Sequence, residues 1–130
     1  MDRLILPEVD STMNEAARSA ARLLRPTWIL ALRQTAGRGR RGRDWRDPPG
    51  NFAATFVLRP EGGPADAARH SFVAALALHD ALAEVTGLPD LLSIKWPNDV
   101  LLNGGKVAGI LLESGSAGGM THLAIGIGVN

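Results

Sequence analysis

The chain has 130 residues, a formal net charge of +1, 45% hydrophobic and 21% charged residues, and no cysteine. These values are typical of one soluble globular domain. The missing cysteines exclude disulfides, thiolate zinc sites and cysteine nucleophiles, and they fit a cytoplasmic protein. No apolar run approaches the roughly 20 residues of a membrane span, and the N-terminus lacks the apolar core of a signal peptide.

The first third of the chain predicts one helix and two strands. Ser11 or Thr12 is placed to cap an alanine-rich helix that runs to about Leu24. Apolar runs at residues 28–32 and 51–59 predict buried strands on either side of a loop rich in arginine and glycine.

A long helix is predicted from residue 65 to about residue 85, with Gly87 and Pro89 ending it. Helical periodicity selects five positions of this helix that should face the core. They are Phe72, Ala75, Leu76, Leu78 (or His79) and Leu82.

The second half of the chain predicts sheet. A short strand at residues 91–96 precedes a hairpin whose strands are 99–102 and 106–113, joined by a glycine turn. A further turn at 114–119 leads to a last strand at 121–129, directly before the end of the chain. We interpret this abrupt end as a truncation.

The loop after the first buried strand concentrates positive charge. Residues 38–46 contain five arginines and one aspartate, which is a local charge of +4, so the rest of the chain sums to −3. Arginine presents forked donors that suit phosphate or carboxylate, and glycine lets backbone N–H groups approach the same ligand. The loop is predicted to close on an anion such as phosphate. A solvated basic turn, or a nonspecific contact with nucleic acid, is the alternative.

Residues 95–100 place polar groups around a Trp-Pro pair between two strands. Trp96 offers a rigid wall for a ligand, and Asn98 and Asp99 offer acceptors for a metal or an amine. An ordinary turn fixed by Pro97 is an equally good interpretation. The histidines show no metal-ligand spacing, so the residues identify no certain metal site, and Asp99 stays an open candidate.

Glycines near the last strands predict an open sheet face. Lys106 opens a strand that contains Gly109, and it is placed to bind a carboxylate or phosphate, although an exposed hairpin lysine is the simpler interpretation. Gly126 and Gly128 alternate with apolar residues, so one face of the last strand is nearly bare. That face is predicted either to floor a ligand pocket or to receive a helix.

Five segments, in this order, resemble the catalytic domain of biotin–protein ligases. They are residues 10–12, 37–43 with Trp45, 95–99, 105–113 and 126–130. The resemblance covers essentially the whole chain, residues 1–130. It implies an α+β (mixed α/β) fold, with a mostly antiparallel sheet flanked by helices, similar to the catalytic core of class II aminoacyl-tRNA synthetases. It also implies that the C-terminal domain is absent, and that DNA binding is not expected, because no helix-turn-helix segment precedes Asp10.

The activity that the resemblance implies has two steps. ATP and Mg²⁺ activate biotin as biotinyl-5′-adenylate, and a lysine of a biotin carboxyl carrier domain, such as that of acetyl-CoA carboxylase, then takes the biotin. Such an enzyme would be cytoplasmic, without a membrane partner, and is compatible with a homodimer.

The resemblance also assigns roles to single residues. Those implied to bind biotin are Ser11, Thr12, Gln34, Gly37, Arg38, Lys106 and Gly109. Those implied to bind the adenylate or phosphate are Arg38, Arg40, Arg43, Trp45, Asn98 and Asn130. The implied catalytic residues are Lys106, Arg40 and Asp99, the last of them near the incoming amine or the magnesium ion.

Two other functions remain as alternatives. A lipoate or octanoate ligase would share the fold, and a nucleic-acid-binding module would use the arginine loop alone.

One departure from the family also stands out. Met13 follows Thr12 where the family often has Asn, and this predicts a helix start shifted by one residue.

Overall fold

The computed structural model describes the backbone of residues 1–130 and every side chain except those of residues 64 and 117. Its strands are β1 (Asp2–Leu6), β2 (Thr27–Ala31), β3 (Phe52–Leu58), β4 (Leu92–Lys95), β5 (Asp99–Leu102), β6 (Gly105–Ala117) and β7 (Met120–Val129). Its α-helices are α1 (Thr12–Ser19) and α2 (Pro64–Thr86), and short 3₁₀ turns occupy Ala20–Arg22, Arg40–Gly42 and Pro89–Leu91.

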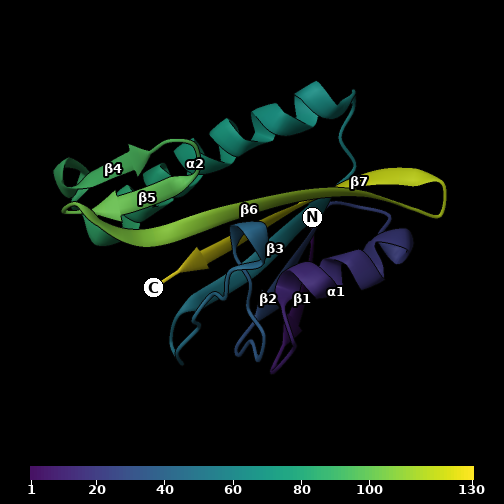
Figure 1. Cartoon of the computed structure of the whole chain (residues 1–130), viewed down its shortest axis with the longest axis horizontal. Coiled ribbons are helices and arrows are strands. Elements are labelled where there is room, and N and C mark those ends of the chain that lie inside the picture. The colour runs from purple at the N-terminus through teal and green to yellow at the C-terminus, as the bar shows by residue number, and fades with distance from the viewer.

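The strands form one sheet in the order β1-β2-β3-β7-β6-β5-β4 (Figure 1). The β1–β2 pair is parallel and the other pairs are antiparallel. The predicted α+β fold with a mostly antiparallel sheet is therefore confirmed. The long strand β7 pairs along its whole length with β6 from Ala108 onward, and these two strands form the centre of the sheet.

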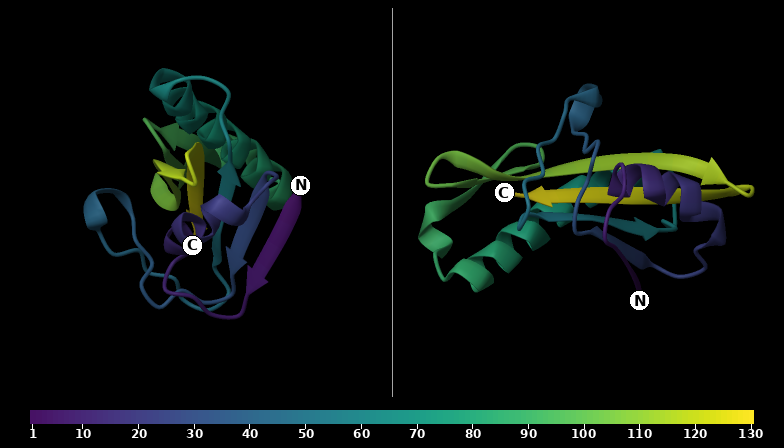
Figure 2. Two further views of the ribbon diagram at one scale, coloured as in Figure 1. Left: turned by 90° about the vertical axis from the view of Figure 1, so that its right-hand side faces the viewer. Right: turned by 90° about the horizontal axis from the view of Figure 1, so that it is seen from below.

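The two helices lie on opposite faces of the sheet. Ala124 packs in the cluster under α1, whereas its neighbours Leu123 and Ile125 pack in the cluster under α2, as the alternation of side chains along a strand requires. Figure 2 shows α1 and the arginine loop on one side of β6 and β7, with α2 on the other. The functional residues predicted on α1 and on the loop therefore share a face.

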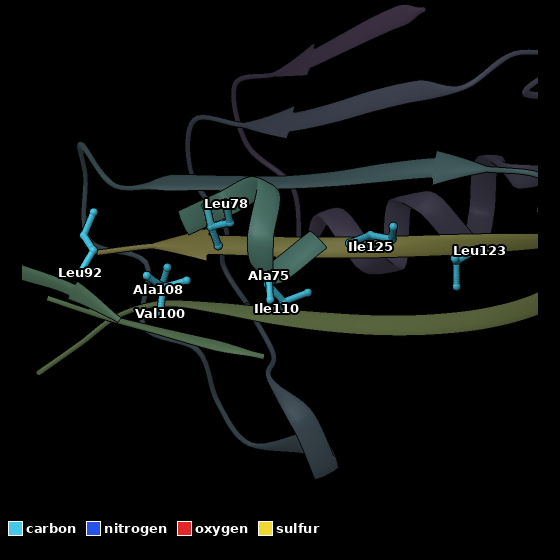
Figure 3. Packing of buried hydrophobic residues seen from close by; sticks show 8 residues of the cluster. All are labelled: Ala75, Leu78, Leu92, Val100, Ala108, Ile110, Leu123 and Ile125. Atoms are coloured by element: carbon cyan, nitrogen blue, oxygen red, sulfur yellow. The ribbon is translucent and has the colours of Figure 1, made fainter. Parts of the chain in front are cut away.

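The larger cluster joins α2 to strands β4 to β7. It consists of Ala75, Leu78, Leu92, Val100, Ala108, Ile110, Leu123 and Ile125 (Figure 3). The prediction that Phe72 and Leu76 face this core was wrong, because their exposed fractions are 39% and 58%. The contact runs through Ala75 and Leu78 instead, and Phe72 stacks on Trp96 with the ring centroids 4.5 Å apart.

One strand, one helix end and one turn differ from the sequence prediction. Strand β1 was not predicted, because it is a short edge strand that gains its structure only by pairing with β2. Helix α1 ends at Ser19 rather than near Leu24, and a 3₁₀ turn follows it. The turn expected at residues 114–119 is only Gly118–Gly119, both with positive φ, as tight hairpins require.

An apolar groove of about 420 Å³ lies on the α2 side of the sheet, where α2 leaves part of β2 and β3 uncovered. Trp28 and Phe56, whose ring centroids are 4.9 Å apart, lie in its lining. Among the helices described here, none has the length and hydropathy to cross a membrane.

Replacing Ile29 by Ala should destabilise the fold strongly. Ile29 is fully buried between α1 and the sheet, and truncating a buried isoleucine costs about 2–5 kcal/mol. Chemical denaturation would measure the loss in the free energy of unfolding. The matched control is Ile5→Ala on the edge strand, where the side chain is 58% exposed and the change should stay within about 0.5 kcal/mol. Equal losses at both positions would contradict this placement of the core.

Candidate ligand pocket beneath the arginine loop

A pocket lies on the α1 face, between the start of α1, the arginine loop and strands β5 to β7. Nine of the residues singled out from the sequence line it. They are Ser11, Thr12, Gln34, Arg38, Arg40, Trp45, Asp99, Lys106 and Gly109. Residues from five separate parts of the chain thus converge, although sequence spacing alone does not bring them together.

The start of α1 is fixed by a set of buried hydrogen bonds. Ser11 is the N-cap, and its Oγ accepts from the backbone N–H of Asn14 at 3.0 Å. Gln34 Oε1 accepts from the backbone N–H and the hydroxyl of Thr12, at 2.8 and 3.2 Å. The buried hydroxyl of Thr55 lies 2.8 Å from that of Thr12. The polar end of the pocket is therefore oriented without a ligand.

The arginine loop has a defined backbone. The carbonyl of Gly37 accepts from the N–H of Trp45 at 2.9 Å, and the N–H of Gly39 donates to the carbonyl of Arg43 at 2.7 Å. A Cβ added at buried Gly37 would lie 2.8 Å from the Trp45 carbonyl oxygen, so only glycine fits there. Arg41 takes a positive φ of 59° at the tip. The loop is thus a narrow hairpin whose tip carries Arg40 and Arg41.

The bare glycine face of β6 and β7 is filled by two side chains. A Cβ on Gly128 would lie 2.5 Å from Cε2 of Trp45, and one on Gly109 would lie 3.3 Å from Cζ3 of the same ring. A Cβ on Gly126 would lie 2.7 Å from Sδ of Met13. The indole of Trp45 therefore rests in a slot that side chains at these positions would close.

Met13 was not identified as a site residue from the sequence. It is buried and lines the pocket. The signal was present, since Met13 directly follows the capping residues, but it was interpreted only as a shift of the helix start. The helix in fact begins at Thr12, with Ser11 as its cap.

Four of the predicted site residues do not line the pocket. Gly37 and Asn98 are buried beside it, and Asn98 donates to the Ile110 carbonyl at 2.7 Å. Arg43 is exposed, and Asn130 accepts from the side chain of Asn51 at 2.9 Å.

Trp96 was expected to wall the pocket, and this expectation was wrong. Its ring is 70% exposed and stacks on Phe72 of α2, whereas Trp45 lies among the residues that line the pocket. The Trp-Pro pair belongs to the junction between β4 and β5, where the sheet meets the helix.

One cation and one anion face each other in the pocket. Lys106 Nζ lies 3.1 Å from Asp99 Oδ1 and 5.4 Å from the centroid of the Trp45 ring. A ligand carboxylate or phosphate at Lys106 would therefore compete with Asp99. Among the described side chains, no group of three His, Cys, Asp or Glu is placed to hold a metal ion.

A chain of hydrogen-bonded side chains, charged except for Asn14, runs from α1 to the loop and β6. Arg18 donates to both carboxylate oxygens of Asp10, at 3.0 and 2.7 Å, and Asp10 accepts from Asn14 at 2.9 Å. Asn14 in turn accepts from Arg38 Nε at 3.0 Å, and Arg38 forms a bidentate ion pair with Glu113 of β6. This ion pair raises the pKa of Arg38 and lowers that of Glu113, against the opposing effect of burial.

Replacing Gly128 by Ala should displace the Trp45 indole. The new methyl group would occupy the slot, and overpacking of this kind costs about 1–3 kcal/mol. Tryptophan fluorescence should shift to longer wavelength as the ring becomes exposed. The control is Gly105→Ala, where the added Cβ would lie 3.6 Å from the Leu102 carbonyl, an ordinary contact. An unchanged spectrum and stability for Gly128→Ala would contradict this packing.

Asp10 should make the stability of the fold depend on acidic pH. Hydrogen bonds from Arg18, then from Asn14 and the Ser11 backbone, hold the pKa of Asp10 well below its ordinary value near 3.8. Because the folded pKa is the lower one, the stabilisation is complete above the ordinary value and is lost as pH falls through the folded value. The wild type should melt above Asp10→Asn at pH 7, and the difference should shrink below about pH 4. A difference independent of pH would contradict the ionic contribution.

Comparison with known proteins identifies the family. A model of the biotin/lipoate A/B protein ligase family matches residues 6–130. The biotin–[acetyl-CoA-carboxylase] ligase of Paracoccus denitrificans is 61% identical over 127 residues, which are 97% of this chain and 53% of the relative. The bifunctional ligase/repressor BirA of Escherichia coli is 38% identical over 97% of this chain and 39% of its own length. The chain thus spans about half, or less, of the length of these relatives.

Solved structures agree with this match. The biotin protein ligase of Leishmania major in complex with biotinyl-5-AMP has a TM-score of 0.80 and 31% identity, over 99% of this chain and 57% of that one. The ligase of Aquifex aeolicus in complex with biotin and ATP also has a TM-score of 0.80, with 35% identity, over 99% of this chain and 52% of that one. The chain belongs to the biotin/lipoate A/B protein ligase family.

Proposed function

We propose that this chain carries the adenylate-forming site of a biotin–protein ligase. The observation that carries the proposal is the convergence, in one pocket, of a buried hydrogen-bonding end, a lysine and an arginine-rich loop. Its polar end consists of Ser11, Thr12 and Gln34, and its charged end of Lys106 and Arg40. The relatives named as biotin ligases, and the structures that hold biotin with ATP, support the same assignment.

The polar end suits the ureido ring of biotin. That ring presents two N–H donors and one carbonyl acceptor. The hydroxyls of Ser11 and Thr12 each offer both a donor and acceptors, and the Gln34 side chain adds an amide. Because Thr12 and Gln34 hold each other and the Asn14 backbone fixes Ser11, little ordering is needed when the ring binds.

The charged end suits attack by one anion on another. In the first step a biotin carboxylate oxygen forms a bond to the α-phosphorus of ATP, while the bond to pyrophosphate breaks. Fixed cations at this point reduce the repulsion and stabilise the charge of the transition state. Lys106 and Arg40 fill this role in our proposal. A closed loop would also keep water from the reactive adenylate.

The second step transfers the acyl group to an amine. The nitrogen of an acceptor lysine bonds to the biotin carbonyl carbon, and AMP leaves. In our proposal Asp99, which pairs with Lys106 in the free protein, is released when the ligand anion arrives and accepts a proton from the incoming amine. By the printed name of the Paracoccus relative, we infer that the acceptor is the biotin carrier domain of acetyl-CoA carboxylase.

A magnesium ion would enter with the nucleotide. Mg²⁺ sites in such enzymes commonly combine one or two carboxylates with substrate phosphates and water. Asp99 is the carboxylate that lines this pocket. It suits such a shared site, in which the ion would neutralise the phosphate charge.

Lipoate ligation is the second candidate, because the matched family includes lipoate ligases. Plasmodium falciparum LipL1 in complex with lipoate shares the fold at a TM-score of 0.56 and 14% identity, which bears on the fold alone. A lipoyl ring has neither N–H groups nor a carbonyl to satisfy the polar end. Buried polar groups left without partners reject such a ligand strongly, so biotin is favoured.

Replacing Lys106 by Ala tests the proposed chemistry. Loss of a fixed cation that acts mainly in the transition state should slow biotin-dependent pyrophosphate release by about 10²-fold or more, with a smaller effect on biotin affinity. The control is Lys95→Ala, an exposed lysine at the end of β4. Calorimetric titrations with biotin and with lipoate accompany the assay. Binding of lipoate but not of biotin, or equal rates for both variants, would overturn the proposal.

A further inference from the structure

We propose that Glu113 is a positioning residue that, with Asn14, fastens the arginine loop over the pocket through Arg38. Arg38 would then serve the reaction as an anchor, and Arg40 would be the arginine that meets the ligand phosphate. This division of roles rests on the proposed function for its chemistry. The anchor itself rests on contacts that need no ligand.

All three guanidinium nitrogens of Arg38 are occupied. Nε donates to Asn14 Oδ1 at 3.0 Å, Nη2 donates to Glu113 Oε2 at 2.9 Å, and Nη1 donates to Glu113 Oε1. A bidentate arginine–carboxylate pair fixes the plane of the guanidinium as well as its position. Two of its five N–H groups are not used in these bonds, but the guanidinium could not turn toward a phosphate elsewhere in the pocket without breaking at least one of the three. The structure therefore assigns its side chain to the sheet and to α1.

Arg40 has the opposite character. Its residue is exposed and lines the pocket, and no ion-pair partner for it occurs among the side chains that the structure describes. A cation that is not already paired can meet a ligand anion without first breaking a protein contact. Two arginines only two residues apart are thus suited to different tasks.

The loop is held at two points on one face of β6. Gly109 receives the Trp45 ring and Glu113 receives Arg38, and these residues lie four positions apart on the strand, about 13 Å. Leu111, which lies between them on the same face, lines the pocket. The two contacts therefore bracket the pocket, and losing either would free one arm of the loop.

The Arg38–Glu113 ion pair can break at little cost to the stability of the fold. The side chains of Arg38 and Glu113 are 29% and 43% exposed, and pairs at this level of exposure contribute little to overall stability. Losing the pair should accordingly change loop closure more than it changes the fold. This difference separates a positioning role from a merely structural one.

The test compares Glu113→Gln with the wild type. The variant keeps the shape of the side chain but loses the charge. Trypsin cleavage after Arg40, Arg41 or Arg43 should become several-fold faster in the free protein, and biotin should dissociate about 10-fold faster in stopped-flow tryptophan fluorescence, with the melting temperature nearly unchanged. The control is Glu84→Gln, an exposed glutamate near the end of α2, which should change none of these quantities.

A double-mutant cycle makes the result specific to the pair. Arg38→Gln, which also loses the bond to Asn14, should accelerate cleavage at least as much as Glu113→Gln, and the double variant should be no worse than Arg38→Gln, because both changes remove the same ion pair. The exchanged pair Arg38→Glu with Glu113→Arg should recover part of the protection. Additive effects, or cleavage unchanged by Glu113→Gln, would overturn the proposal. Cleavage is measured without ligand, so a protein that binds no biotin would refute the proposed function and still test the anchor.

Discussion

The packing of the Trp45 indole against Gly109 and Gly128 is the contact on which the rest of the site depends. It requires two glycines on adjacent strands at the same level of the sheet, and β6 pairs with β7 in a register that places Gly109 opposite Gly128. With side chains there, the ring could not reach the sheet. The loop would then lose its contact with the sheet, and the pocket would lose the Trp45 ring beside Lys106.

The polar end of the pocket depends on a similar fit between distant segments. Met13 lies against Gly126 and sets the height of α1 above the sheet, so that Thr12 meets both Gln34 and Thr55. A helix standing further from β7 would separate Thr12 from these partners. The pocket is thus built from glycines that admit large side chains, and not from glycines that leave the sheet bare.

Local patterns in the sequence predicted most elements, because caps, turns and apolar periods act over a few residues. The residues of the pocket were predicted from the resemblance to a known family. Local patterns failed where long-range packing decides the outcome. Strand β1 forms only by pairing with β2. Phe72 follows the helical period but stacks on Trp96 instead of packing in the core. Trp45 lines the pocket, whereas Trp96 lies outside it. No local signal separates Trp45 from Trp96.

The charge pattern of the sequence can be interpreted only together with ion pairs between distant segments. The sequence shows a loop of +4 against a chain of −3, which describes an anion site in general terms. In the folded chain Glu113 and Asp99 already hold Arg38 and Lys106, so part of the positive charge is neutralised before a ligand arrives. A ligand anion that binds Lys106 in place of Asp99 breaks an existing ion pair, whereas an anion that binds Arg40 breaks none. A ligand with two separate negative groups would meet both cations, whereas one with a single negative group would be drawn first to Arg40. In the proposed reaction, Arg40 would meet the nucleotide phosphate first, and Lys106 would be released from Asp99 once the carboxylate is in place.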